Sequence, residues 1–251
     1  MKQRVLEIKD LSKQYGDRQV LKKINLSVNK GEVLVILGPS GSGKSTLLRC
    51  LNGLEDFQSG EILFKGEVIE QNEKTWQVLR PKIGMVFQSY DLFPNKTVLE
   101  NCMIAPLIVQ KRERQEVETL VRKLLDQVGL GDYTHRYPHQ LSGGQKQRVA
   151  IVRCLAMEPE LILLDEITAS LDPEVVQEVL RVILNLAKED ATMVIVTHQM
   201  EFAKRVSDKV AFLDQGELVE VTEGTSFFES PKTKRAKRFI ESLTLDYGEE
   251  I

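Results

Sequence analysis

No apolar run in this sequence is long enough to cross a bilayer. Stretches such as Val33–Leu37 and Leu161–Leu164 are short, whereas a spanning helix needs about 20 apolar residues. Residues 1–4 lead directly into a strand-like alternation and not into an apolar leader segment. We therefore expect neither a membrane span nor a signal peptide.

Excess basic charge and clustered cysteines are also missing. The 34 Lys and Arg residues face 37 Asp and Glu residues, which gives a formal net charge of −3. Without a basic field we expect no nucleic-acid partner. Cys50, Cys102 and Cys154 are widely separated and have no metal-ligand spacing. They are typical of small buried residues in a reducing, cytosolic compartment, and 42% hydrophobic residues suffice for a globular core.

Short strand patterns alternate with helical patterns along most of the chain. Residues 5–8 and 24–28 alternate with period 2, and residues 32–37 are largely apolar. Further strands are predicted at 60–64, 68–69, 83–87, 161–164, 193–197, 210–213 and 217–221. Helices are predicted at 44–54, 97–110, 112–128, 143–157, 174–188, 200–207 and 234–243. This alternation predicts an α/β fold with a mixed, mostly parallel sheet and ligands at the carboxyl ends of its strands.

The domain organisation follows from the same patterns. We predict one domain over residues 1–251, with an α/β core and an N-terminal antiparallel β subdomain at 1–88 and 159–251. Residues 89–158 are predicted to form an inserted α-helical subdomain, because their first fifty residues lack strand runs.

A glycine-rich segment joins a buried strand to an amphipathic helix. Glycines allow a tight turn in which successive N–H groups point at phosphate oxygens, and the helix start adds its positive dipole end. Lys44 is expected to reach the β- and γ-phosphates, and Ser45 to bind Mg²⁺. A plain Gly- and Ser-rich turn is the alternative, but the strand and helix favour a phosphate loop. The nine residues of the pattern are Gly38, Pro39, Ser40, Gly41, Ser42, Gly43, Lys44, Ser45 and Thr46.

An acidic pair, Asp165-Glu166, ends the apolar strand at 161–164. Beside a phosphate loop, Asp165 is expected to hold Mg²⁺ directly or through water. Glu166 is then expected to polarise the attacking water as a general base. Acidic residues also occur where a strand simply leaves the core, and the phosphate loop decides against that alternative.

The segment Leu141-Ser142-Gly143-Gly144-Gln145 precedes the acidic strand. Ser142 and Gln145 have the spacing of a helix capping box. The segment also resembles the signature of the ATP-binding-cassette family, whose members have a P-loop NTPase core. The resemblance implies that Ser142, Gly143, Gly144 and Gln145 contact the γ-phosphate of an ATP held by a partner subunit. Both roles are compatible, because a helix start binds anions.

Four further residues occur in the order of that family. The resemblance implies that Tyr15 stacks on adenine and that Gln88 contacts Mg²⁺ and the attacking water. It also implies that Asp172 lies at a dimer seam and that His198 contacts the γ-phosphate. Asp172 before Pro173 equally fits an ordinary helix N-cap. The remaining histidines match no catalytic position.

Segments 85–94 and 97–101 resemble the polar amino-acid importers of this family, of the glutamine, histidine and arginine type. The resemblance implies a head-to-tail homodimer that encloses two ATP and Mg²⁺, transmembrane permease subunits and, indirectly, an extracytoplasmic solute-binding protein. It places the chain at the cytoplasmic face of the membrane. Phe93, Val98 and Leu99 fit either permease contacts or core positions. Transport of another small solute, export and a cell-division complex remain alternatives.

The chain departs from the family pattern at three places. Ile167 stands where a proline usually follows the acidic pair, and Gln199 where an acid commonly follows His198. Ala169-Ser170 reverses the usual order of small residues before Leu171-Asp172. No catalytic position is lost, so we expect hydrolysis to survive.

Overall fold

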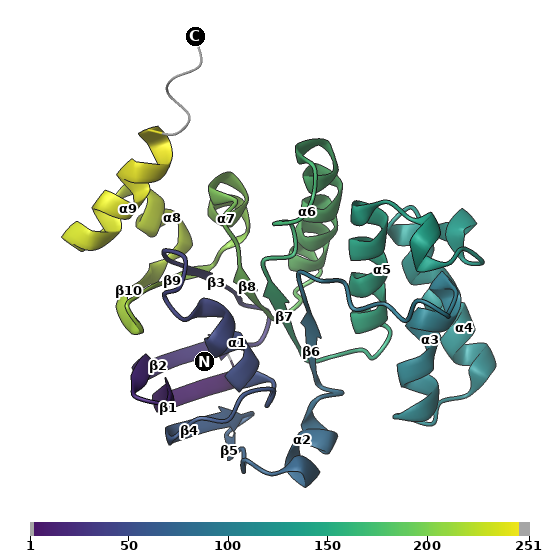
Figure 1. The fold of residues 1–251 in the computed structure, drawn as a ribbon, viewed down its shortest axis with the longest axis horizontal. Helices are drawn as coiled ribbons and strands as arrows, with labels where there is room; N and C mark the ends of the chain where they lie inside the picture. The colour runs from purple at the N-terminus through teal and green to yellow at the C-terminus, as the bar shows by residue number, and fades with distance from the viewer. Residues whose placement is uncertain (1–2, 246–251) are drawn as a thin grey trace. The chain divides into compact units, whose positions relative to one another are not determined.

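The computed structural model describes residues 3–245 (Figure 1). They fall into two compact units. The first unit comprises residues 1–72 and 192–251, and the second comprises residues 73–191. Residues 1 and 2, part of the segment in which no leader is predicted, lie outside the described residues.

An antiparallel sheet in the first unit has the strand order β2-β1-β4-β5. In β1 and β2 apolar residues are mostly buried and the charged residues between them are mostly exposed, as period-2 patterning predicts. The two strands are longer than the predicted segments at 5–8 and 24–28. The bounds are β1 (Arg4–Tyr15), β2 (Arg18–Asn29), β4 (Ser59–Phe64) and β5 (Glu67–Val68).

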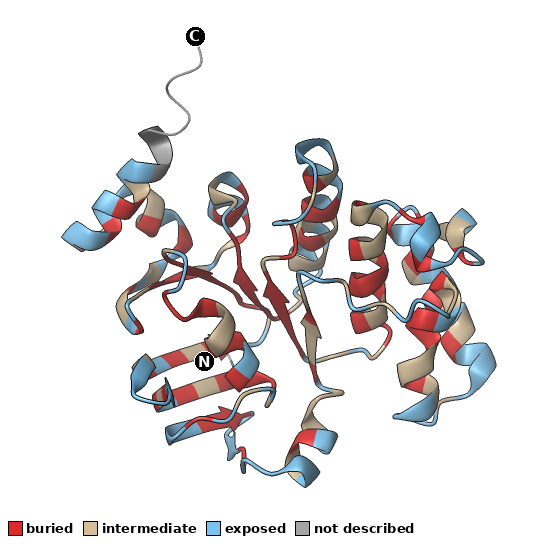
Figure 2. Ribbon diagram, in the orientation of Figure 1, coloured by how far each residue is buried: buried red, intermediate tan, exposed pale blue. Residues whose placement is uncertain are grey.

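The first unit also contains a mixed, mostly parallel set of strands. β3 pairs in parallel with β8 and with β9, and β10 pairs antiparallel with β9. Every residue of β3 and β8 is buried, as expected for strands covered on both faces (Figure 2). The bounds are β3 (Val33–Leu37), β8 (Met193–Val196), β9 (Lys209–Asp214), β10 (Glu217–Glu223), α1 (Lys44–Leu51), α7 (Met200–Val206), α8 (Gly224–Glu229) and α9 (Lys234–Leu245).

The second unit combines two parallel strands, β6 and β7, with most of the helices. A hydrophobic cluster that includes Val98, Val121 and Val149 packs α3, α4 and α5 together. The bounds are β6 (Ile83–Val86), β7 (Leu161–Asp165), α2 (Glu73–Leu79), α3 (Val98–Ile108), α4 (Arg114–Gln127), α5 (Gly143–Leu155) and α6 (Pro173–Lys188), with short 3₁₀ turns at Gly131–Tyr133 and Pro138–Gln140.

The predicted fold class is confirmed, since the chain combines a mostly parallel sheet, an antiparallel sheet and a helical region. Two short helices, α2 and α8, were not predicted. The predicted subdomain at 89–158 lies wholly within the second unit. Its boundaries stay a prediction.

Candidate functional site

The phosphate loop joins β3 to α1 and has a backbone that only glycine permits at two positions. Gly38 has φ 153°, and a Cβ atom there would overlap the carbonyl oxygen of Leu213. Gly43 has φ 108°, and its Cβ would lie 2.9 Å from the carbonyl oxygen of Val20. Both angles belong to the region that side chains disfavour. The loop therefore keeps its tight course because these glycines let neighbouring backbone approach.

Two side chains of the loop have the chemistry of a polyanion site. Lys44 is 4% exposed, and its Nζ donates to the carbonyl oxygens of Gly38 and Pro39, each at 3.0 Å. The Oγ of Ser42 is buried and has no hydrogen-bond partner among the described residues. Such groups normally find a partner. A held ammonium, an unpartnered hydroxyl and the start of α1 fit the phosphates of a nucleotide.

Tyr15 ends β1 beside the phosphate loop and keeps 45% of its surface exposed. The Nζ of Lys13 lies 4.5 Å from the ring centroid and 3.2 Å from Oε2 of Glu55. Burial and then the neighbouring Glu55 raise the pKa of Tyr15, and Thr46 lowers it. The ring thus lies near Glu55 and near Thr46 of α1, while part of it stays open to solvent.

His198 follows β8 on the same edge of the sheet as the phosphate loop. In the parallel pair of β3 and β8, Ile36 lies opposite Val196. Gly38 and His198 each come two residues later, so both leave the carboxyl ends of paired strands. His198 is exposed, and the hydroxyl of Thr197 accepts a hydrogen bond from Gln199 N at 3.0 Å.

The second unit repeats this arrangement with β6 and β7. Val86 lies opposite Leu164, so Gln88 and Glu166 both follow the ends of paired parallel strands. Asp165 is 7% exposed, Glu166 is half-buried and Gln88 is exposed. The structure therefore brings the acidic pair and the predicted glutamine to one edge.

The turn after β7 is closed although Ile167 replaces the usual proline. Glu166 has φ 47°, an uncommon value for a residue with a side chain. Its carbonyl oxygen accepts a hydrogen bond from Ala169 N at 3.0 Å, and Ile167 is 4% exposed. A backbone hydrogen bond and a buried side chain hold the turn in place of a proline ring.

A capping box is present at the start of α5. The two roles predicted for Ser142, as a helix cap and as an anion ligand, both depend on this helix start. Ser142 Oγ accepts from Gln145 N at 3.3 Å, and Gln145 Oε1 accepts from Ser142 N at 2.9 Å. The Ser142 hydroxyl keeps its own proton to donate. Gly144 packs so closely against α6 that a Cβ there would overlap Cγ1 of Val175.

Asp172 is the N-cap of α6 and Pro173 is the first helical residue, as predicted. The carbonyl oxygen of Asp172 accepts hydrogen bonds from Val175 N at 2.9 Å and Val176 N at 3.1 Å. Its carboxylate is exposed and makes no capping hydrogen bond within the described chain. The side chain is therefore not needed by the helix itself.

Gln147 is a buried polar residue that sequence reasoning missed. It is 0% exposed, and its Nε2 donates to the carbonyl oxygen of Phe87, next to Gln88, at 3.3 Å. Its Oε1 has no partner in the part of the chain that the structure describes. Its burial could have been inferred from helical spacing. Gln147 lies three residues after Gly144 and four before Ile151, which places it on the buried face of α5.

The predicted site residues thus form two groups, one in each unit. The first unit contains Tyr15, the phosphate loop and His198. The second contains Gln88, Asp165, Glu166, Asp172 and the signature segment 142–145. Between residues 3 and 245 no three His, Cys, Asp or Glu side chains gather to hold a metal ion. The predicted Mg²⁺ ligands are instead the hydroxyl of Ser45, the amide oxygen of Gln88 and the carboxylate of Asp165. Mg²⁺ prefers oxygen ligands of this kind.

An apolar groove of about 580 Å³ lies in the second unit. Phe93, Ile108 and Val109 line it and are 45%, 67% and 54% exposed. Val98 is 0% exposed and belongs to the hydrophobic cluster, against which Leu99 packs. A permease contact and a core position were both open for Phe93, Val98 and Leu99. Phe93 lines this groove, whereas Val98 is a core residue and Leu99 packs on the core.

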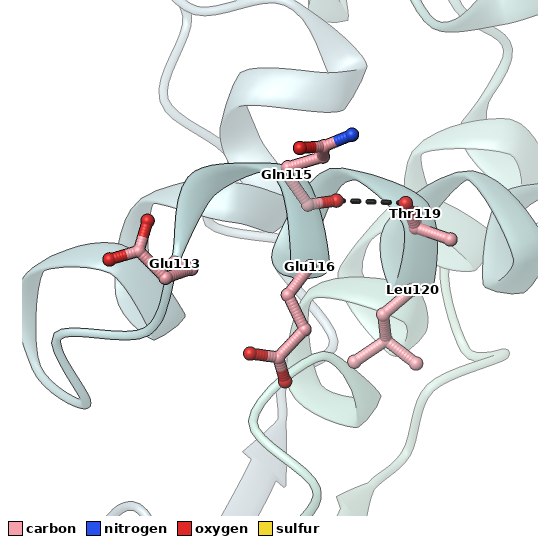
Figure 3. Close-up of a pocket in the computed structure, with 5 residues that line it drawn as sticks. All are labelled: Glu113, Gln115, Glu116, Thr119 and Leu120. Atoms are coloured by element: carbon pink, nitrogen blue, oxygen red, sulfur yellow. Dashed lines mark hydrogen bonds between the residues drawn. The ribbon is translucent and has the colours of Figure 1, made fainter.

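A second groove, on α4, is lined mostly by polar residues (Figure 3). Glu113 and Glu116 line it, and the Thr119 hydroxyl donates to the carbonyl oxygen of Gln115 at 2.8 Å. It contains no predicted site residue.

His135 and His139, which match no catalytic position, are exposed. No helix among the described residues is both long and apolar enough to cross a membrane.

Residues 21–169, which include the phosphate loop, the signature segment and the acidic pair, match the ABC transporter family. The chain belongs to the ATP-binding-cassette transporter family. The L-cystine import ATP-binding protein TcyC of Bacillus subtilis (strain 168) is 51% identical to this ABC transporter chain over 243 residues, covering 95% of the chain and 98% of that protein. The arginine transport ATP-binding protein ArtM of the same organism is 50% identical over 239 residues, covering 95% and 100%.

A solved ATP-binding cassette also resembles this ABC transporter chain, with a TM-score of 0.77 and 34% identity. The likeness covers 87% of this chain and 98% of that one. That structure is dimeric and represents a post-hydrolysis state bound to ADP and Pi.

Proposed function

We propose that this chain binds and hydrolyses ATP and thereby energises the uptake of polar amino acids through a membrane permease. The phosphate loop carries the proposal, because Lys44 and the unpartnered Ser42 hydroxyl lie at the start of α1. The two relatives named for L-cystine import and arginine transport support an amino-acid cargo.

In the proposed mechanism the phosphate loop binds and orients the triphosphate. Its N–H groups and Lys44 contact phosphate oxygens, and the exposed face of Tyr15 receives the adenine ring. Ser45, Gln88 and Asp165 are the residues that would hold Mg²⁺ in the nucleotide-bound state. When bound, Mg²⁺ neutralises charge on the β- and γ-phosphates.

Glu166 is the proposed general base. Its carboxylate accepts a proton from the attacking water, Gln88 orients that water, and His198 contacts the γ-phosphate. The closed turn between Glu166 and Ala169 supports this role, because a base must be held in a defined position.

We propose further that two copies assemble head to tail around two nucleotides. Ser142, Gly143, Gly144 and Gln145 of one copy then bind the γ-phosphate held by the other, and Asp172 lies at the seam. The Ser142 hydroxyl retains a proton to donate, and the start of α5 favours an anion. Hydrolysis removes the bridging γ-phosphate, so the dimer reopens and drives the permease. The dimeric state of the similar cassette supports this cycle.

The apolar groove is the proposed docking site for a short permease helix. The exposed side chains of Phe93, Ile108 and Val109 supply the apolar contact area that an amphipathic helix requires. In this proposal the permease contact holds the chain at the cytoplasmic face of the membrane.

The decisive experiment measures ATPase activity in liposomes that contain this subunit and its permease, with a solute-binding protein loaded with each amino acid in turn. We expect a polar amino acid to stimulate turnover. Activity that ignores every amino acid would leave the ATPase intact and remove the import assignment. Glu166→Gln is the matched control: it should bind ATP and accumulate as a dimer, and normal turnover of this variant would exclude Glu166 as the base.

A further inference from the structure

Tyr90 lies two residues after Gln88 and has a strained backbone. Its φ is 61°, and that of the following Asp91 is 48°. Residues with a Cβ atom disfavour this left-handed region, Asp less than Tyr, and two such residues in succession are unusual there. Such a conformation persists only where surrounding contacts hold it, and strained backbone of this kind is concentrated at functional sites.

Arg153 of α5 holds this backbone in place. Its guanidinium donates from Nη2 to the carbonyl oxygen of Tyr90 at 3.1 Å and from Nη1 to that of Asp91 at 2.5 Å. The Ser89 hydroxyl also donates to Oδ1 of Asp91 at 2.9 Å. The loop after Gln88 is therefore tied to the helix that the signature segment begins.

The side chain of Tyr90 reaches two other segments that carry site residues. Its hydroxyl lies 3.1 Å from Oγ of Ser170, two residues before Asp172. A Cβ atom on Gly143 would lie 3.1 Å from the same hydroxyl and 3.1 Å from Cδ2 of Leu171. Ser170 belongs to the Ala169-Ser170 pair whose order departs from the family pattern, and the structure supplies this serine with a partner.

We propose that Tyr90 is a positioning residue whose hydroxyl joins the loop after Gln88, the start of the signature helix and the loop before Asp172. The inference rests on the proposed function, which assigns Gly143 and Asp172 to the nucleotide-bound dimer. In this proposal Tyr90 contacts neither the nucleotide nor the attacking water. It holds the segments that face the second copy in one arrangement, so its loss weakens dimer formation and not the capture of nucleotide by the phosphate loop.

The test uses Tyr90→Phe, Ser170→Ala and the double variant, each combined with Glu166→Gln to stop turnover. Sedimentation equilibrium measures dimerisation at saturating ATP, and calorimetry measures ADP affinity. We expect each single change to raise the dimer dissociation constant by about 3- to 10-fold, the effect of one hydrogen bond. ADP affinity should stay within about 2-fold, and the double variant should resemble either single one.

Tyr133→Phe is the matched control, because Tyr133 packs against the hydrophobic cluster of the same unit. Unchanged dimerisation of Tyr90→Phe, additive effects of the two changes, or an equal loss of ADP affinity would overturn the inference. Failure of the Glu166→Gln parent to dimerise with ATP would instead overturn the proposed dimer, and the inference with it.

Discussion

Tyr15 depends on a buried cation for its position. Lys13 is 6% exposed, and a buried ammonium is costly unless it is paired. Here it pairs with Glu55 and with the face of the Tyr15 ring. The sequence identified Tyr15 through its family position alone. It contained no sign of the ion pair between Lys13 and Glu55, because that pair joins segments that only folding brings together.

Replacing Lys13 tests this contact. We expect Lys13→Met to weaken ATP affinity by about 2- to 10-fold, the size of a cation–π interaction. Affinity for inorganic triphosphate, which has no base to stack, should be unchanged in calorimetric titrations. Lys13→Arg should restore ATP affinity because it keeps the cation. Equal losses for both ligands, or a full effect in a Tyr15→Leu background, would contradict the interpretation.

The three cysteines provide a second test at this scale. Burial raises the pKa of Cys50, Cys102 and Cys154 to about 12. At pH 8 these thiols therefore stay protonated in the folded chain, and a protonated thiol is a poor nucleophile. We expect slow alkylation by iodoacetamide in the native protein and fast alkylation in guanidinium chloride, followed by mass spectrometry. Rapid native modification of any of the three would show that its site is open.

Helix α5 unites several functions in one element. Its capping box was predictable, because Ser142 and Gln145 show the required spacing in the sequence. The contacts of Gly144 with α6, of Gln147 with Phe87 and of Arg153 with the Tyr90 loop were not predictable. They join segments far apart in the chain, whereas a cap is local.

Close packing at Gly144 leads to a stability prediction. Gly144→Ala places a Cβ against Val175, and overpacking costs about 1–3 kcal/mol. The gain in helix propensity, about 1 kcal/mol, offsets only part of this. We expect a lower free energy of unfolding in urea, and recovery when Val175→Ala is added. A Gly144→Ala variant that is as stable as the parent, or that Val175→Ala does not improve, would exclude the clash.

Helices α2 and α8 show the limit of local patterns. Their sequences, Glu73–Leu79 and Gly224–Glu229, contain β-branched, aromatic and glycine residues with weak helix propensity. Helices this short are not stable alone. Packing decides them, since Trp76 is 4% and Phe227 is 0% exposed.

At the scale of the whole molecule, the groove in the second unit predicts how the chain meets its permease. Ile108 is 67% exposed, so Ile108→Asp should fold normally. A charge in the apolar groove should abolish co-purification with the permease in detergent, while ADP affinity of the isolated subunit is kept. Val68→Asp changes another exposed apolar residue outside the groove and is the control. Retained co-purification of Ile108→Asp would exclude the groove as the docking site.

Local sequence was enough to predict the phosphate loop, the capping box of α5 and the positions of the buried strands along the chain, because these depend on neighbouring residues and on hydrophobic periodicity. The folded chain was needed to show that Val98 is core while Phe93 lines a groove, since apolar residues close together in the sequence look alike until their neighbours are known. It also decided the left-handed backbone of Tyr90, which its residue type disfavours. That conformation exists because Arg153, distant in sequence, supplies the hydrogen bonds that hold it.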